Sequence, residues 1–382
     1  MSIPLIILGF ILFVGLVVLH ELGHFLVARR NGVEVEEFGI GFPPRAKVLG
    51  KKDGTVYTLN WLPLGGFVKL KGEHDADTAK GTFGAASLWA KVKIMLAGVV
   101  VNALTAFVLL TILAAVGMPK ILENQFTVES DTKIIQREVL VGYVEPNSPA
   151  QKAGIRDQTE LAAIGMPNAP KDFITSADQL PELTRKYAGK EVEIVVRDGN
   201  EARQLQTTLR TTEEVDASRK EAEDTNDPEK AKGYLGIQPA EYIVQRSTWS
   251  SPVIAAGLIK QITGATFKGL GTALSGLFQG DTEKASSQVS GIVGISYIIG
   301  KGSALGLQFI LLIIAIISLT LAIMNVLPIP ALDGGRLFVT LLFRAIRKPL
   351  TQRKEEWIHG TGFILLMLLF VLITIVDINR FT

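Results

Sequence analysis

Residues 3–28 read IPLIILGFILFVGLVVLHELGHFLVA, and His20, Glu21 and His24 are the only ionisable side chains in this run. At a rise of about 1.5 Å per residue, a helix of this length can cross a bilayer. Ionisable groups in such a helix are costly and usually have a function. The stretch therefore predicts a membrane-spanning helix with a functional site in its last third.

The segment His20-Glu21-Leu22-Gly23-His24 has the HExxH pattern. On a helix, histidines four residues apart lie on one face and can bind the same zinc ion, with Glu21 beside them as a candidate base. The chain has no cysteine, so any metal must be held by His, Asp or Glu. A histidine pair that only hydrogen-bonds neighbouring helices is the alternative, but it explains neither the spacing nor Glu21.

The composition indicates a membrane protein with aqueous parts. The chain has 382 residues, 48% of them hydrophobic and 20% charged, and the charges cluster between apolar blocks. Four stretches qualify as membrane spans: residues 3–28, 94–117, 305–327 and 362–376. We predict a polytopic α-helical membrane protein in contact with lipid. A net charge of +2 gives no indication of a nucleic-acid partner.

Basic residues in the short connections predict the orientation. Arg29 and Arg30 follow the first span, Lys91 and Lys93 precede the second, and five more lie within residues 344–354. The positive-inside rule places these connections in the cytoplasm and both termini outside.

Between the first two spans, the sequence predicts a membrane-associated β-hairpin that turns at Asp53-Gly54. With its two spans it forms an N-terminal half, residues 1–120. An exposed strand edge can pair with an extended polypeptide segment, and this hairpin is our candidate for such a binding edge. Its candidate substrate-binding residues are Gly39, Gly41, Gly65 and Gly66. A plain cytoplasmic hairpin is the alternative.

Residues 127–241 read as a mixed α/β domain outside the membrane, with a strand at 139–144 and paired strands at 191–197 and 203–209. Within it, residues 212–232 are dense in charge and predict a solvated loop. Residues 250–300 predict amphipathic helices on the membrane surface. A buried helix of the α/β domain is the alternative for this last segment.

The third span ends in NVLPIPALDGG, residues 325–335, where the prolines must interrupt helical hydrogen bonding. Asp333 therefore lies at an irregular helix end in the C-terminal half, residues 303–382. The predicted topology brings it to the depth of His20 and His24, as a third metal ligand. Asn325 is a candidate to bind an unwound substrate backbone, with helix-end capping as the alternative. In the second span, Asn102 is expected to hydrogen-bond across a helix interface rather than to bind metal.

HExxH in the first span, NxxPxxxLDG after a later span and an SPAxxAG turn at residues 148–154 together resemble the site-2 protease family of intramembrane metalloproteases. The likeness is greatest to the bacterial regulator-of-sigma-E protease branch, and the SPAxxAG turn resembles a PDZ domain. Residues 156–165 and Ile292 depart from the family pattern. The resemblance implies zinc bound by His20, His24 and Asp333, and Glu21 as the catalytic residue. It further implies the bacterial inner membrane, with single-pass membrane proteins as substrates, such as trimmed anti-sigma factors or remnant signal peptides.

Two other classes compete with the protease. A metal transporter would carry metal-binding residues at several membrane depths, whereas here they gather at one. A non-proteolytic PDZ scaffold would have no reason to keep Glu21. No soluble partner is indicated, and the sequence leaves open whether the PDZ-like domain binds peptide ends or filters substrates by size.

Overall fold

The computed structural model describes residues 3–198, 201–281 and 292–381. The chain divides into two compact units. We call the first the membrane unit; it comprises Met1–Met118, Asn124–Asp131 and Thr248–Thr382. The second, the sheet unit, comprises Pro119–Glu123 and Thr132–Ser247.

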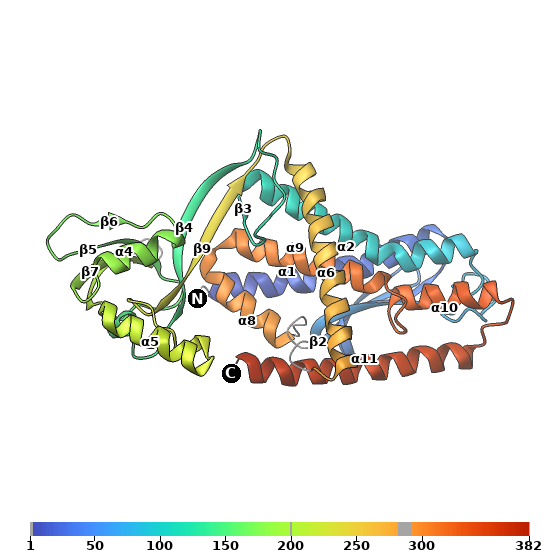
Figure 1. Cartoon of the computed structure of the whole chain (residues 1–382). Helices are drawn as coiled ribbons and strands as arrows, with labels where there is room; N and C mark the ends of the chain where they lie inside the picture. The colour runs from blue at the N-terminus through green and yellow to red at the C-terminus, as the bar shows by residue number, and fades with distance from the viewer. Residues whose placement is uncertain (1–2, 199–200, 282–291, 382) are drawn as a thin grey trace. The chain divides into compact units, whose positions relative to one another are not determined.

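Four helices of the membrane unit are long and apolar enough to cross a bilayer: α1 (Ile3–Arg30), α2 (Leu88–Val116), α9 (Leu307–Val326) and α11 (Gln352–Phe381). They confirm the four predicted spans. The last helix is longer than predicted because the polar residues before Gly362 continue its first turns. Helices α1, α2 and α9 pack side by side (Figure 1), so α1 is held between partners where it carries His20 and His24.

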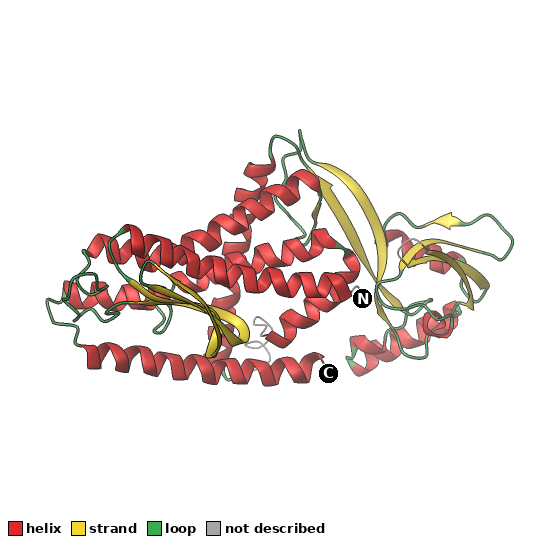
Figure 2. Ribbon diagram, turned by 180° about the vertical axis from the view of Figure 1, so that it is seen from behind, coloured by secondary structure: helices red, strands yellow, loops and turns green. Residues whose placement is uncertain are grey.

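The predicted hairpin is present as β1 (Val35–Lys52) and β2 (Thr55–Leu70) (Figure 2). Its turn has Asp53 and Gly54 at φ 49° and 84°, the left-handed region that Asp-Gly turns favour. The first part of β1 pairs on one side with residues 66–70 and on the other with residues 56–59. An apolar cluster that includes Phe25, Phe38 and Leu70 packs this sheet against α1. The hairpin is therefore fixed beside the metal-motif helix.

Among the described residues, the remaining helices of the membrane unit are α6 (Ser251–Gln279), α8 (Ile292–Gly302), η3 (Ser303–Leu305) and α10 (Asp333–Ala345). In Figure 1, α6 crosses α2 and α9 steeply, and Ile254, Leu258 and Ile262 bury against them. Its second half exposes large apolar side chains, with Phe278 90% exposed. Part of the family-like stretch at residues 289–295 lies outside the described residues.

The sheet unit is built on an antiparallel sheet with the order β3-β9-β4-β5-β7-β8, in which β6 pairs with β5. Its core includes Val141, Ile164 and Ile194. Ser148 Oγ accepts a hydrogen bond from Gln151 N at 3.1 Å and caps a short helix. The strands are β3 (Met118–Pro119), β4 (Lys133–Val144), β5 (Glu160–Gly165), β6 (Asp172–Phe173), β7 (Glu191–Asp198), β8 (Glu201–Thr208) and β9 (Ile237–Arg246), and the helices are α3 (Pro149–Lys152), η1 (Ala177–Gln179), α4 (Leu180–Lys186), α5 (Thr212–Thr225) and η2 (Pro228–Lys230).

The prediction of a loop at residues 212–232 is wrong, because α5 occupies most of this segment. A capping box starts the helix: Thr211 Oγ1 accepts from Glu214 N, and the Glu214 carboxylate accepts from Thr211 N. The buried side chains of Val215 and Ala222 form a narrow apolar stripe on the helix. Capping and two small buried contacts outweigh the charge density that indicated a loop. The predicted domain end at residue 241 also falls inside β9, which runs on to Arg246.

Candidate metal centre

The three predicted ligands converge in the membrane unit. His20 Nε2 and His24 Nε2 lie 3.2 Å apart, and each is 3.2 Å from Asp333 Oδ2. Both histidines are buried. The histidines come from adjacent turns of α1, and Asp333 is the first residue of α10. Among the described residues, this is the one cluster of His, Asp or Glu able to hold a metal ion.

The triangle fits zinc. Ligand atoms at about 2.0 Å from a tetrahedral ion lie about 3.3 Å from one another, close to the separations found here. Asp333 Oδ2 is buried and has no hydrogen-bond partner among the described residues. A cation would satisfy the three donor atoms that converge here. With three protein ligands, a tetrahedral site keeps one position open, as catalytic zinc sites do.

Helix α2 fixes the histidine rings. His24 Nδ1 lies 2.7 Å from the carbonyl oxygen of Ile94, to which it donates a hydrogen bond, so Nε2 is left free to bind metal. His20 Nδ1 lies 3.2 Å from Asn102 Nδ2. Metal binding through His20 Nε2 requires a proton on Nδ1, so it requires the flipped amide, in which Asn102 Oδ1 faces the ring and accepts that proton. The prediction that Asn102 bonds across the helix interface is confirmed, and its partner is the candidate metal ligand His20.

Two glycines permit this close approach of α1 and α2. A Cβ on Gly98 would lie 2.5 Å from His24 Nε2 and 2.6 Å from His20 Nδ1. A Cβ on Gly23 would lie 2.8 Å from Val101 Cγ2 and 3.0 Å from the Ala97 carbonyl oxygen. Because Gly23 and Gly98 have no side chains, the two histidine rings lie against α2. There the Ile94 carbonyl and the Asn102 side-chain amide can hold them.

Asp333 is presented by an irregular loop at residues 327–332. Helix α9 ends at Val326, before Pro328 and Pro330. A Cβ on Gly334 or Gly335 would collide with the backbone of the loop, at Val326 and Ile329 respectively. The two glycines after Asp333 thus let α10 start directly against the chain that leads into it.

Glu21 lies beside the ligands. The cavity next to it has a volume of about 120 Å³ and is lined by Glu21, His24, Asp333 and Arg336, among others. Val68 of β2 lines the same cavity. Gly66 of β2 lies next to Glu21, since a Cβ there would be in ordinary contact with Glu21 Cγ at 3.4 Å. The site therefore combines a metal-binding triangle, an acid–base group and space for water.

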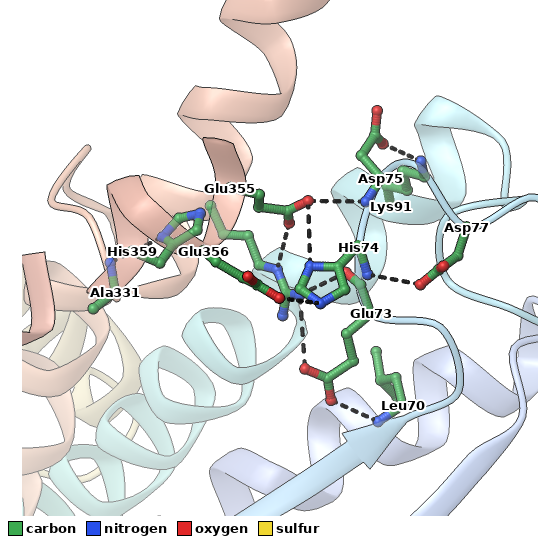
Figure 3. Close-up of polar contacts among 11 residues, drawn as sticks. Leu70, Glu73, His74, Asp75, Asp77, Lys91, Ala331, Glu355, Glu356 and His359 are labelled. Atoms are coloured by element: carbon green, nitrogen blue, oxygen red, sulfur yellow. Dashed lines mark hydrogen bonds and ion pairs between the residues drawn. The ribbon is translucent and has the colours of Figure 1, made fainter. Parts of the chain in front are cut away.

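Arg336 and Glu73, which line this cavity, belong to a polar cluster (Figure 3). Arg336 of α10 donates a hydrogen bond to the Glu73 carbonyl oxygen at 2.6 Å, and its Nε lies 3.6 Å from Glu355 Oε1 of α11. Glu355 is buried and accepts a hydrogen bond from Asp75 N at 3.0 Å. The fully buried Lys91 pairs with Asp75. These contacts join α2, α10, α11 and the segment after β2 around the metal centre.

The candidate substrate-binding residues fall in two places. Gly39, Gly65 and Gly66 lie in the paired strands β1 and β2, and the rings of Phe67 and Phe42 lie against Gly39 and Gly65, respectively. Gly41 has φ 83°. Asn325 lies in the last turn of α9, half-buried, and its side chain makes no hydrogen bond to any described residue. The structure thus brings Gly66 to Glu21, whereas Asn325 does not line the cavity.

Membrane-spanning helices that carry a metal triangle and a carboxylate define a membrane-embedded metalloenzyme. The model of peptidase family M50 matches residues 8–369, and the chain belongs to this family. It is 31% identical, over 98% of both chains, to a Clostridium perfringens protein whose name assigns it provisionally to the zinc metalloproteases. It is 30% identical to the zinc metalloprotease RasP of Geobacillus kaustophilus and 26% identical to RasP of Shouchella clausii, over 97% of each chain.

The chain is therefore an intramembrane zinc metalloprotease of the site-2 protease type, which acts on membrane proteins. This finding decides against the transporter and the scaffold. The candidate ligands were predicted from two local motifs, and the structure brings all three together. Arg336 and Glu73 were not singled out from the sequence, since no motif spacing marks them. The Ile94 carbonyl carries no side-chain signal at all.

Proposed function

We propose that His20, His24 and Asp333 bind the catalytic zinc and that Glu21 transfers protons during hydrolysis of peptide bonds in the spans of single-pass membrane proteins. The observation that carries this proposal is the 3.2 Å triangle of ligand atoms, with Glu21 lining the adjoining cavity.

Each residue of the site has a separate task. When zinc is bound, it polarises the scissile carbonyl and lowers the pKa of water in its open position. Glu21 accepts a proton from the attacking water and delivers it to the leaving amine. Ile94 and Asn102 keep the histidine rings in the tautomer that binds metal. The helices exclude bulk water, which strengthens the charge interactions within the site.

Two variants test this assignment. Glu21→Gln preserves the shape of the side chain but cannot accept the proton, so we expect full zinc content and loss of cleavage. Asp333→Ala should lower both zinc content and cleavage, whereas the wild-type protein should hold about one zinc per chain. Metal analysis of the purified proteins and cleavage of a membrane substrate are measured together. Wild-type zinc content and activity in Asp333→Ala would refute the assignment.

The exposed side of β2 is the proposed holding edge for substrate. Residues 66–70 pair with β1 on one side, and no described strand pairs with their other side. A substrate span must unwind locally to expose a peptide carbonyl, and adding it as an extended strand would keep it open. Gly66 places this edge beside Glu21. In this proposal Gly39, Gly41 and Gly65 allow the close strand crossing, and Asn325 binds the opened backbone.

The sheet unit is proposed to be a PDZ-like filter outside the membrane. A groove of about 530 Å³ lies between α4 and the Gly233–Ile237 segment, with α5 on one wall. Arg210, beside this segment, donates two hydrogen bonds to the Glu145 carboxylate, at 2.7 and 2.8 Å. Its charge is therefore compensated, which favours steric exclusion of bulky substrates over tight capture of a peptide carboxylate.

Removal of the sheet unit tests the filter. Thr132 Oγ1 and Ser247 Oγ lie 2.9 Å apart, so a short flexible linker can replace residues 132–247. We expect the shortened enzyme to cleave a pre-trimmed substrate and also, slowly, the untrimmed form that the intact enzyme refuses. An enzyme that binds zinc but cleaves neither would show that the unit is needed for catalysis itself.

The basic connections support an orientation with both termini and the sheet unit outside the bacterial inner membrane. Single cysteines at the exposed positions Lys80 and Thr225 test it in this cysteine-free chain. A membrane-impermeant thiol reagent should label position 225 but not position 80 in intact cells. The reverse labelling would overturn the orientation.

A further inference from the structure

The loop that presents the metal ligand contains a strained residue. Ala331, two positions before Asp333, has φ 76°, a left-handed conformation that a residue with a Cβ rarely adopts. Such a conformation persists only when surrounding contacts impose it. Since the backbone at residue 331 sets the direction in which the chain enters Asp333, whatever holds Ala331 also controls the position of the ligand.

A side chain of α11 makes that contact. The backbone N–H of Ala331 donates a hydrogen bond to His359 Nδ1 at 3.1 Å, as Figure 3 shows. Because Nδ1 accepts, the proton of the neutral ring sits on Nε2. His359 Nε2 is buried and has no hydrogen-bond partner among the described residues. Within the part of the chain that the structure describes, the Ala331 N–H is thus the one group to which this ring is hydrogen-bonded.

Two further contacts lie on the same face of α11. Glu355 is one turn before His359 and faces Arg336 of α10. Gly362 is nearly one turn after it, and a Cβ there would lie 2.8 Å from the carbonyl carbon of Pro330. Residues four and three apart on a helix share a face. The stripe of Glu355, His359 and Gly362 therefore contacts the chain on both sides of Asp333.

We propose that His359 is a positioning residue for the metal ligand Asp333: it holds Ala331 in its left-handed conformation from α11. This inference deepens the proposed function and depends on Asp333 being a zinc ligand. His359 does not touch the reacting atoms; it acts through the loop. The chemistry requires only a hydrogen-bond acceptor at the position of Nδ1.

The test compares variants of the full-length protein by zinc affinity, measured by competition with a chelator, and by substrate cleavage. His359→Leu removes the acceptor and should weaken zinc binding by about tenfold or more, the usual effect of losing a group that orients a ligand. His359→Asn keeps an acceptor at the position of Nδ1 and should stay within about threefold of wild type. Gln352→Leu, an exposed polar-to-apolar change on the same helix, is the matched control.

A second-site change makes the test specific. Glycine adopts positive φ freely, so Ala331→Gly should make the loop less dependent on His359. The double variant Ala331→Gly/His359→Leu should recover most of the zinc affinity lost in His359→Leu. A merely structural role of His359 in packing α11 would not be rescued in this way. If His359→Leu does not accumulate, His359→Ala provides the same comparison with a smaller side chain.

The outcomes separate this inference from the proposed function. Wild-type protein that binds no zinc, or Asp333→Ala that binds it fully, refutes the metal site itself. Zinc binding that is normal in wild type and equally normal in His359→Leu refutes the positioning role. Loss in His359→Leu without any recovery in the folded double variant also refutes it, because Ala331 would then not be the link.

Discussion

Replacing Gly98 with alanine is the sharpest test of how α2 builds the metal centre. The added Cβ would lie 2.5 Å from His24 Nε2 and 2.6 Å from His20 Nδ1, whereas ordinary contact begins at 3.4 Å. The rings must therefore retreat by roughly 0.8–0.9 Å, or α2 must move by that amount. Catalytic and metal sites tolerate displacements of only about 0.5 Å. We expect zinc affinity to fall by about 10–100-fold and cleavage by about 100-fold.

The control is Gly15→Ala in α1, where no atom lies within 4 Å of the added Cβ. Both variants place alanine in a membrane-spanning helix, so both gain the same helix propensity, about 0.5–1 kcal/mol in favourable cases. Gly15→Ala should therefore keep wild-type zinc binding and have a thermal stability equal to or above that of the wild type. The two variants differ only in what the methyl group meets.

The assay is zinc affinity by chelator competition on detergent-solubilised protein, with cleavage of a membrane substrate measured in parallel. Circular dichroism checks that both variants remain helical. The reasoning would be refuted by a Gly98→Ala variant that holds zinc and cleaves like wild type, because the interhelical contact would then not constrain the rings. Equal losses in both variants would also refute it, since a general membrane-helix effect would explain them.

Three further results are expected. Asn102→Leu should weaken zinc binding by about tenfold or more, whereas Asn102→Asp should retain most of the zinc affinity, because only the carboxylate can still accept the His20 Nδ1 proton. Equal zinc affinity in the two variants would contradict this prediction. Gly362→Ala should lower zinc affinity, since its Cβ would press on Pro330, whereas Gly360→Ala, with no atom within 4 Å, should not. Hydrogen bonds from Ser250 and Thr248 hold the Asp131 pKa well below its usual 3.8, so Asp131 stabilises the fold above pH 3.8 and loses this effect as the pH falls through the lower folded pKa. In thermal melts between pH 2 and 7, Asp131→Asn should therefore lack this pH-dependent stabilisation. Identical pH profiles of wild type and Asp131→Asn would contradict this prediction.

Much of the ligand set could be predicted because it is local in sequence. The spacing of His20 and His24 is fixed by one helical turn, and the prolines before Asp333 must break a helix wherever they occur. The Asp53-Gly54 turn is equally local, and the structure has the hairpin that it predicts. A local pattern failed at residues 212–232, where charge density indicated a loop. The capping box of Thr211 and Glu214 was the signal that should have been weighed against it.

What the sequence could not show is how distant segments hold those ligands. Ile94 holds His24 through a backbone carbonyl, which every residue possesses, so no residue type marks the contact. His359 lies 28 residues beyond Ala331, and nothing in the spacing identifies the bond between them. A left-handed φ at an alanine is also invisible in sequence, because glycine is the residue that would normally signal it.

These contacts show that one helix carries the HExxH motif while other helices orient its side chains. Helix α1 supplies two donors, but their ring orientations come from α2 and their third partner is the first residue of α10, which the loop at residues 327–332 presents. That loop is held in turn by α11 through His359 and Gly362. Because a catalytic zinc needs three donors within a few tenths of an ångström, any of these elements can weaken the site without contributing a ligand. The effects of Gly98 and His359 variants on zinc affinity should therefore exceed those of equally conservative changes on the exposed faces of the same helices.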